Sequence, residues 1–228
     1  RRVLFRSTTP VSDADKPKVV TANVVKSTKT KDFLTGTLTN SSITYGDYYL
    51  PKQSVTNVNN GYAITTSNFE YIHNPSGSGS DYFVGRLQTK TDVVQAYNSS
   101  KSGKEEYSYE SNLLKTFKIW NRDNTGYIQE TYNYDGFGNI TGKTTSNSVD
   151  SQTQKETSLY EPKGRFVEKK TDALGLETLI EYNNWGQIKK QTDPFNNTII
   201  NTYDGWGKLL TSTTNLGGTT TYQYDRDN

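Results

Sequence analysis

The chain has 228 residues, and its 26 basic and 24 acidic residues are interspersed, which gives a net charge of +2. It shows no run of like charge and no apolar run of about 18 residues, which argues against a nucleic-acid-binding stripe, a membrane-surface patch and a membrane span. Cysteine is absent, which excludes disulfides and thiolate zinc sites.

Hydrophobic residues make up only 31% of the chain and the mean hydropathy is −0.85, yet 12% of residues are aromatic, with 17 Tyr against 8 Phe. Disordered chains lack aromatic residues, so this composition favours an ordered protein. A tyrosine ring adds apolar area while its hydroxyl keeps a polar partner or water. We therefore expect a sheet with partly dry faces, which suits a shell around a wet interior better than a solid globule.

The two ends of the chain indicate a fragment of a longer protein. Residues 1–7, Arg-Arg-Val-Leu-Phe-Arg-Ser, match the translation of a common sequencing-adapter end and are predicted to be an assembly scar outside the fold. The alternative is an ordinary basic N-terminal segment. The chain contains no methionine, and its last residues begin a repeat that does not finish.

Residues 8–130 are predicted to be a degenerate β-repeat region, because short β-branched and aromatic stretches alternate with turn signals. Residues 74–80, Asn-Pro-Ser-Gly-Ser-Gly-Ser, are predicted to be a surface loop. The predicted strands of this region include 19–25, 34–38, 45–50, 54–58, a pair at 63–66 and 69–72, and 116–120.

Residues 131–228 carry a regular repeat in which a tyrosine precedes a glycine by four positions and an apolar residue follows that glycine by two. Each period holds two strand-like stretches and two turn signals, so each unit is predicted to be a β-hairpin. The longer step from the first to the second copy is assigned to a polar connection at 146–157. The copies are Tyr134, Gly138, Ile140; Tyr160, Gly164, Phe166; Tyr182, Gly186, Ile188; Tyr203, Gly207, Leu209; and Tyr224, which begins the last copy, with Asn228 in its glycine position.

The predicted fold class is therefore all-β: an array of antiparallel β-hairpins forming a long curved or spiralling sheet. Helical spacing of apolar residues is absent from the period. No catalytic, cofactor-binding or metal-ligating residue is predicted, and we expect no enzyme activity.

Three groups of residues are candidates for chemistry. His73 is the only histidine and has no nucleophile motif beside it, so a histidine in a surface loop is favoured. Asp135, Asp204 and Asp225 recur at one place in the repeat. They favour turns over a hydrolytic carboxylate pair, because an active site is made once and a turn in every unit. Asp193-Pro194 is likewise predicted to be a turn.

Phe137, Trp185 and Trp206 precede the repeat glycines and are candidate exposed aromatics, with Lys163 in the second copy. They could form a ladder that contacts a sugar or a partner protein. The favoured interpretation is that each ring packs over the next hairpin and protects its turn.

These motifs resemble the YD repeats of the Rhs (rearrangement hot spot) family. The resemblance covers 131–228 and rests on Tyr-Asp-Gly-Phe-Gly-Asn-Ile at 134–140, Tyr-Asp-Gly-Trp-Gly-Lys-Leu at 203–209, Tyr-Gln-Tyr-Asp-Arg-Asp-Asn at 222–228 and Thr-Asp-Pro-Phe-Asn-Asn at 192–197. A weaker likeness lies at 82–87, which is similar to a segment that precedes the repeats in Rhs and Tc B-component chains. Tyr107 to Leu114 looks like a decayed repeat.

The resemblance implies a secreted or cell-surface bacterial protein whose repeats form a β shell around a C-terminal toxin. The implied partners are neighbouring repeats of the same longer chain and the toxin cargo, with no cofactor. The alternative is a cell-surface adhesion or carbohydrate-binding module, as in wall-associated proteins and teneurins, in which the exposed aromatics would contact a glycan or protein.

Overall fold

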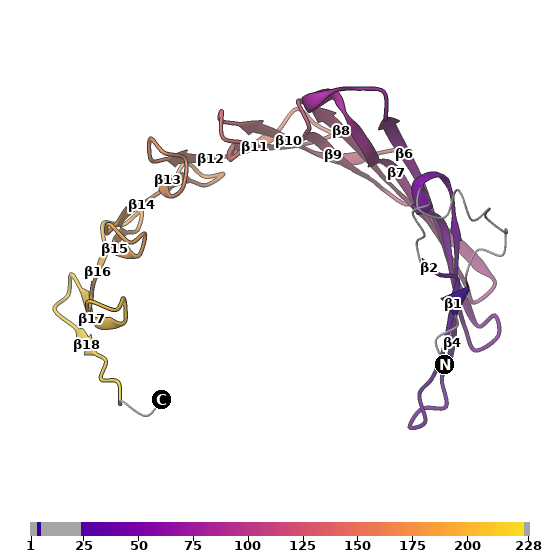
Figure 1. Cartoon of the computed structure of the whole chain (residues 1–228), viewed down its shortest axis with the longest axis horizontal. Coiled ribbons are helices and arrows are strands. Elements are labelled where there is room, and N and C mark those ends of the chain that lie inside the picture. The colour runs from indigo at the N-terminus through magenta and orange to yellow at the C-terminus, as the bar shows by residue number, and fades with distance from the viewer. Residues whose placement is uncertain (1–3, 6–23, 226–228) are drawn as a thin grey trace, which may run out of the picture. The chain divides into compact units, whose positions relative to one another are not determined.

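The computed structural model describes residues 4–5 and 24–225. Within this part of the chain, sixteen strands form one sheet in the order β3 to β18, each hydrogen-bonded to the strands before and after it in sequence (Figure 1). The paired strands run antiparallel. The predicted all-β array of antiparallel hairpins is confirmed.

The chain divides into two compact units, residues 1–129 and 130–228, and β10 (Tyr127–Tyr134) includes the boundary. In the N-terminal unit, β1 pairs only with β2, apart from the large sheet. Apart from Leu4–Phe5, the proposed scar at 1–7 lies outside the described residues. The elements of this unit are β1 (Leu4–Phe5), β2 (Val24–Val25), β3 (Ser27–Lys31), β4 (Leu38–Tyr45), the 3₁₀ turn η2 (Asp47–Tyr49), β5 (Pro51–Val58), β6 (Ala63–Asn74), the 3₁₀ turn η3 (Gly79–Asp81), β7 (Phe83–Ala96), β8 (Ser99–Glu110) and β9 (Leu113–Trp120).

Three strand predictions in this unit were wrong. The predicted pair at 63–66 and 69–72 is one continuous strand, β6, which pairs along its whole length with β7. Most of the stretch at 45–50 is a turn, because the Gly46-Asp47 turn signal outweighs the strand preference of the tyrosines that follow. Most of 34–38 is also a turn, since the Asp32 carboxylate accepts the backbone N–H groups of Leu34 and Thr35.

In the C-terminal unit the strands are short and regular. The predicted long connection at 146–157 was wrong, because Gly142 to Ser146 pair with Thr153 to Thr157 and lengthen two strands instead. The Asn147 side-chain oxygen closes the short turn by accepting the Val149 and Asp150 N–H groups. The strands are β11 (Ile140–Asn147), β12 (Thr153–Tyr160), β13 (Val167–Thr171), β14 (Glu177–Tyr182), β15 (Ile188–Thr192), β16 (Thr198–Tyr203), β17 (Leu209–Thr214) and β18 (Thr219–Thr221).

Turns on both edges of this unit have the same geometry. Except in the turn at Asn147, the N–H of the fourth residue donates to the carbonyl of the first, and the fourth residue has a positive φ. The structural repeat is therefore one strand and one turn, half of the period visible in the sequence. The turns begin 10 or 11 residues apart from Glu161 onward, at Glu161, Asp172, Asn183, Asp193, Asp204 and Thr214.

Neither unit has a dry core. Among the described residues no hydrophobic side chain is buried, and many strand positions are half-buried. Stability must therefore come from cross-strand contacts and from neighbour-to-neighbour stacking, as in other repeat proteins. No helix within residues 24–225 has the length and apolar character needed to cross a membrane.

Candidate functional site

The repeat tyrosines sit at β-bulges, where they link successive hairpins. The register shifts between Glu181 and Tyr182 and again between Thr202 and Tyr203. A bulge re-aims the side chain next to it. The Tyr182 hydroxyl accordingly donates to the Val167 carbonyl (3.0 Å) and that of Tyr203 to the Ile188 carbonyl (2.8 Å). Burial raises the pKa of Tyr182, which keeps this donor protonated.

The same device recurs in the N-terminal unit, where the sequence shows no regular repeat. Tyr45, Tyr71 and Tyr109 each lie at a register shift. The Tyr45 hydroxyl donates to the Val25 carbonyl (2.8 Å) and the Tyr109 hydroxyl to the Leu87 carbonyl (2.9 Å). The decayed repeat suspected at Tyr107 is thus centred on Tyr109. Sequence reasoning missed Tyr45 and Tyr71, although each is a tyrosine near a strand end.

In all turns of the C-terminal unit except the one at Thr214, the side chain of the first residue accepts backbone N–H groups of the turn. Oδ1 of Asp135 accepts the N–H groups of Phe137 and Asn139, both at 2.9 Å. Asp204 does the same for Trp206 and Lys208, both at 2.8 Å. Asp225 ends the described residues.

Asn183 and Glu161 make equivalent pairs of bonds, so an amide or a longer carboxylate also serves. Asp193 caps its turn by accepting the N–H groups of Phe195 and Asn197, which is the turn predicted at Asp193-Pro194.

Aromatic rings lie directly on the turn glycines. A Cβ on Gly164 would lie 2.3 Å from Cδ2 of Phe137, and a Cβ on Gly186 would lie 2.3 Å from Cζ of Phe166. In the copy where Lys163 replaces the ring, Phe166 thus supplies it instead, stacked on Tyr182 at 4.8 Å. The repeat pattern predicts Phe166 as the apolar residue of the second copy, in the position that Ile188 and Leu209 take opposite their tyrosines. That prediction was wrong, because Tyr160 pairs with Val167 instead.

Side-chain amides connect one turn to the next along the same edge. Asn139 donates to the carbonyl of Gly164, and Gln187 donates to the carbonyl of Gly207, both at 2.6 Å. Both amides occupy the fifth position of their turn. Sequence reasoning missed them, and their shared place in the repeat was the available signal.

The candidate aromatics are exposed, and Phe137 and Trp185 also lie against the glycine of the next turn on the same edge. Phe137, Trp185 and Trp206 have exposed fractions of 68, 67 and 88%. The turns of the opposite edge carry a second row of exposed apolar residues at the same third position, which the sequence reading did not single out: Leu174, Phe195 and Leu216, at 83, 76 and 88%.

The remaining predicted positions are less uniform. Ile188 and Leu209 pair with Tyr182 and Tyr203, whereas Ile140 is 42% exposed at the start of β11. Gly138 has a positive φ like the other repeat glycines. The Tyr134 ring lies 6.5 Å from that of Tyr132.

At the end of the described chain, Tyr224 is 47% exposed with Lys208 Nζ 4.9 Å from its ring centre. Asn228 lies outside the described residues. His73 lies in β6, not in a loop, and its Nδ1 accepts the N–H of Gly85 at 3.0 Å, which is a structural role.

The turn carboxylates predict acid sensitivity of the C-terminal unit. Burial raises the pKa of Asp135, but hydrogen bonds from Asn139 and Phe137 outweigh it and hold that pKa below its ordinary value. The bond from the Asn197 side chain lowers the pKa of Asp193. Because the folded pKa values are depressed, the stabilisation is present above the unfolded pKa and is lost as pH falls through the folded one.

We therefore expect the urea midpoint of unfolding to fall from about pH 4 downward. In the double variant Asp135→Asn, Asp193→Asn the amides should keep the turns, as Asn183 does, and part of this acid dependence should disappear. An unchanged pH profile in that variant would show that these carboxylates are not responsible.

No protein-family model matches the chain, and no curated protein sequence does either. Three crystal structures are similar at 12% sequence identity and TM-scores of 0.57 to 0.58. They are TcdB2-TccC3, TcdB2-TccC3 without its hypervariable C-terminal region, and TcdB2-TccC3-Cdc42. The match covers 82 to 84% of this chain but 14% of each of those chains. The present chain therefore shares its fold with a segment of the much longer TcdB2-TccC3 chain.

Proposed function

We propose that this chain is a non-catalytic wall segment of a bacterial Rhs-type β shell, which encloses a toxin encoded C-terminal to the repeats. The observation that carries this proposal is the sheet itself: a run of strands in sequence order with no buried hydrophobic side chain among the described residues. Such a layer extends by adding hairpins and leaves both faces available, which suits an enclosure.

Two further observations support the proposal. The repeated tyrosine bulges and stacked turns are the same structural device made many times, whereas a catalytic site is made once. The fold similarity is to a segment of TcdB2-TccC3, and the motifs of residues 131–228 separately resemble the YD repeats of the Rhs family. Secretion and a toxin cargo belong to the proposal.

The test uses the intact reading frame that contains these residues, expressed and treated briefly with a protease. We expect the segment encoded after the repeats to survive in the native protein and to be digested when the wall is weakened by Gly186→Ala with Gly164→Ala. Gly175→Ala is the matched control, because a Cβ at this turn glycine would meet no atom within 4 Å, and it should keep the protection. Equal digestion in the native protein and the weakened variant would refute the enclosure, as would a reading frame with nothing beyond the repeats.

The exposure of Phe137, Trp185 and Trp206 favours a second candidate, a surface adhesion or carbohydrate-binding module. On a glycan array, binding that Trp185→Ala with Trp206→Ala abolishes while the fold stays intact would support it. The contact of Phe137 with Gly164 and of Trp185 with Gly207 gives these rings a structural role and favours the wall.

A further inference from the structure

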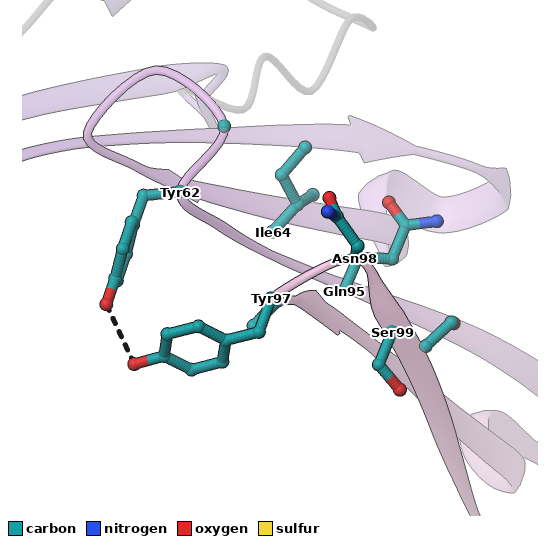
Figure 2. Close-up of a pocket in the computed structure, with 9 residues that line it drawn as sticks. Tyr62, Ile64, Gln95, Tyr97, Asn98 and Ser99 are labelled. Carbon is teal, nitrogen blue, oxygen red and sulfur yellow. Dashed lines mark hydrogen bonds between the residues drawn. The ribbon is translucent and has the colours of Figure 1, made fainter.

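Two hairpin tips of the N-terminal unit meet around a pocket that the repeat does not require. One tip joins β5 to β6 and carries Tyr62, and the other joins β7 to β8 and carries Tyr97 (Figure 2). They lie side by side because Ala63 pairs with Ala96 in the register of β6 and β7. The pocket has a volume of about 500 Å³, within the range of small-molecule sites.

The two tyrosine rings are presented to solvent. Tyr62 is 57% exposed and Tyr97 is 80% exposed, and their rings meet edge to face at 5.4 Å. The Tyr62 hydroxyl donates to the Tyr97 hydroxyl at 2.8 Å, as the dashed line in Figure 2 shows. The Tyr97 hydroxyl accepts this bond and so retains its own proton for a ligand acceptor.

Tyr97 is held in an unfavourable backbone conformation. Its φ is 52° and that of Asn98 is 58°, in a two-residue hairpin turn where Asn, Asp and Gly are preferred. A bulky residue at positive φ is a steric outlier, and such conformations concentrate at functional sites. This turn holds the Tyr97 ring at the hairpin tip, beside the Tyr62 ring.

The pocket lining contains no charged side chain. Beside the tyrosines, its polar groups are the amides of Gln95 and Asn98 and the hydroxyls of Ser99 and Ser100. Rigid tyrosines with adaptable Ser and Asn groups are also the composition of antibody binding loops. Because no cation is present to balance a negative charge, phosphate and nucleic-acid ligands do not fit.

We propose that this pocket binds a neutral saccharide. A sugar ring offers an apolar C–H face for a tyrosine ring and hydroxyls that both donate and accept, which the Gln95 and Asn98 amides can match. A peptide segment would suit this site less well, because the open hollow is short and is bounded by only two hairpin tips. The site is separate from Trp185 and Trp206 and does not depend on the enclosure proposed above.

The test is binding of the full chain to an array of neutral and anionic oligosaccharides, followed by calorimetry with the neutral ones that bind. We expect neutral oligosaccharides to bind, and Tyr62→Ala and Tyr97→Asn each to weaken binding about tenfold or more. Tyr97→Asn suits the positive φ, so its thermal midpoint should not fall, which separates lost binding from misfolding.

Two controls keep the outcome specific. Tyr49→Ala removes another exposed tyrosine at positive φ, 57°, outside the pocket, and should leave binding unchanged. Trp185→Ala with Trp206→Ala should also leave it unchanged. The proposal is overturned if no neutral oligosaccharide binds, if only anionic ones bind, if Tyr97→Asn binds normally, or if a peptide array identifies a peptide as the ligand that the tyrosine variants lose.

Discussion

Gly186→Ala is expected to destabilise the C-terminal unit by roughly 3 kcal/mol. About 1–2 kcal/mol of this comes from placing an L-residue at positive φ, here 80°. The rest comes from overpacking, since the new Cβ would lie 2.3 Å from Cζ of Phe166 and would push that ring off Tyr182. Urea unfolding followed by tryptophan fluorescence measures the loss.

Gly175→Ala is the matched control, because Gly175 also has φ 80° but a Cβ there meets nothing within 4 Å. It should cost only the conformational part, about 1–2 kcal/mol. Adding Phe166→Leu to Gly186→Ala should recover part of the difference, because the smaller side chain makes room. Equal losses for Gly186→Ala and Gly175→Ala would mean that the ring does not lie on the glycine.

Tyr203→Ala is expected to cost roughly 3 kcal/mol, because it removes a half-buried ring and the hydrogen bond to the Ile188 carbonyl. Tyr203→Phe keeps the ring and should cost about 1 kcal/mol, the value of one hydrogen bond. The loss should be local. Amide hydrogen exchange should quicken first in β15 and β16, which the tyrosine connects.

Tyr222→Phe serves as the control, since Tyr222 is 40% exposed and its hydroxyl has no partner among the described residues. Its stability should match that of the parent chain. If Tyr203→Phe also leaves the stability unchanged, the hydrogen bond from the tyrosine hydroxyl contributes nothing, and the repeat tyrosines stabilise the sheet through ring packing alone.

The C-terminal unit was predictable because its geometry needs particular residues at fixed places. A positive φ in each turn favours glycine, and Gly138, Gly164, Gly186 and Gly207 mark it in the sequence. The shorter structural repeat of one strand and one turn was not visible in the sequence, because the turns on the two edges do not always use the same residue at the position of positive φ. Asn196, with φ 64°, replaces glycine in one of them.

The N-terminal unit obscures the same pattern for a physical reason. Several of its turns reach positive φ with residues other than glycine, at Asn59-Asn60, Tyr97-Asn98 and Ser111-Asn112, so no regular glycine spacing survives. Its strands are also longer. The β6 strand runs through Ser67 and Asn68, polar residues that suggested a break, because full pairing with β7 outweighs their weak strand preference.

The pocket at Tyr62 and Tyr97 could not be predicted from sequence. These residues are far apart in the chain, and only the pairing of β6 with β7 brings their hairpin tips together. The rows of exposed apolar residues could have been found, since each of these residues stands two positions after the first residue of a turn.

Disulfide trapping of the β16–β17 hairpin tests the repeat most directly, because the chain has no cysteine of its own. Thr202 pairs with Thr211, and their hydroxyl oxygens are 2.6 Å apart. Thr202→Cys with Thr211→Cys should therefore oxidise readily, and trypsin cleavage at Lys208 should leave two linked peptides. Thr202→Cys with Ser212→Cys places the thiols on opposite faces and should stay reduced. Trapping of the second pair in place of the first would show a slipped register and would contradict the tyrosine bulge on which the wall is built.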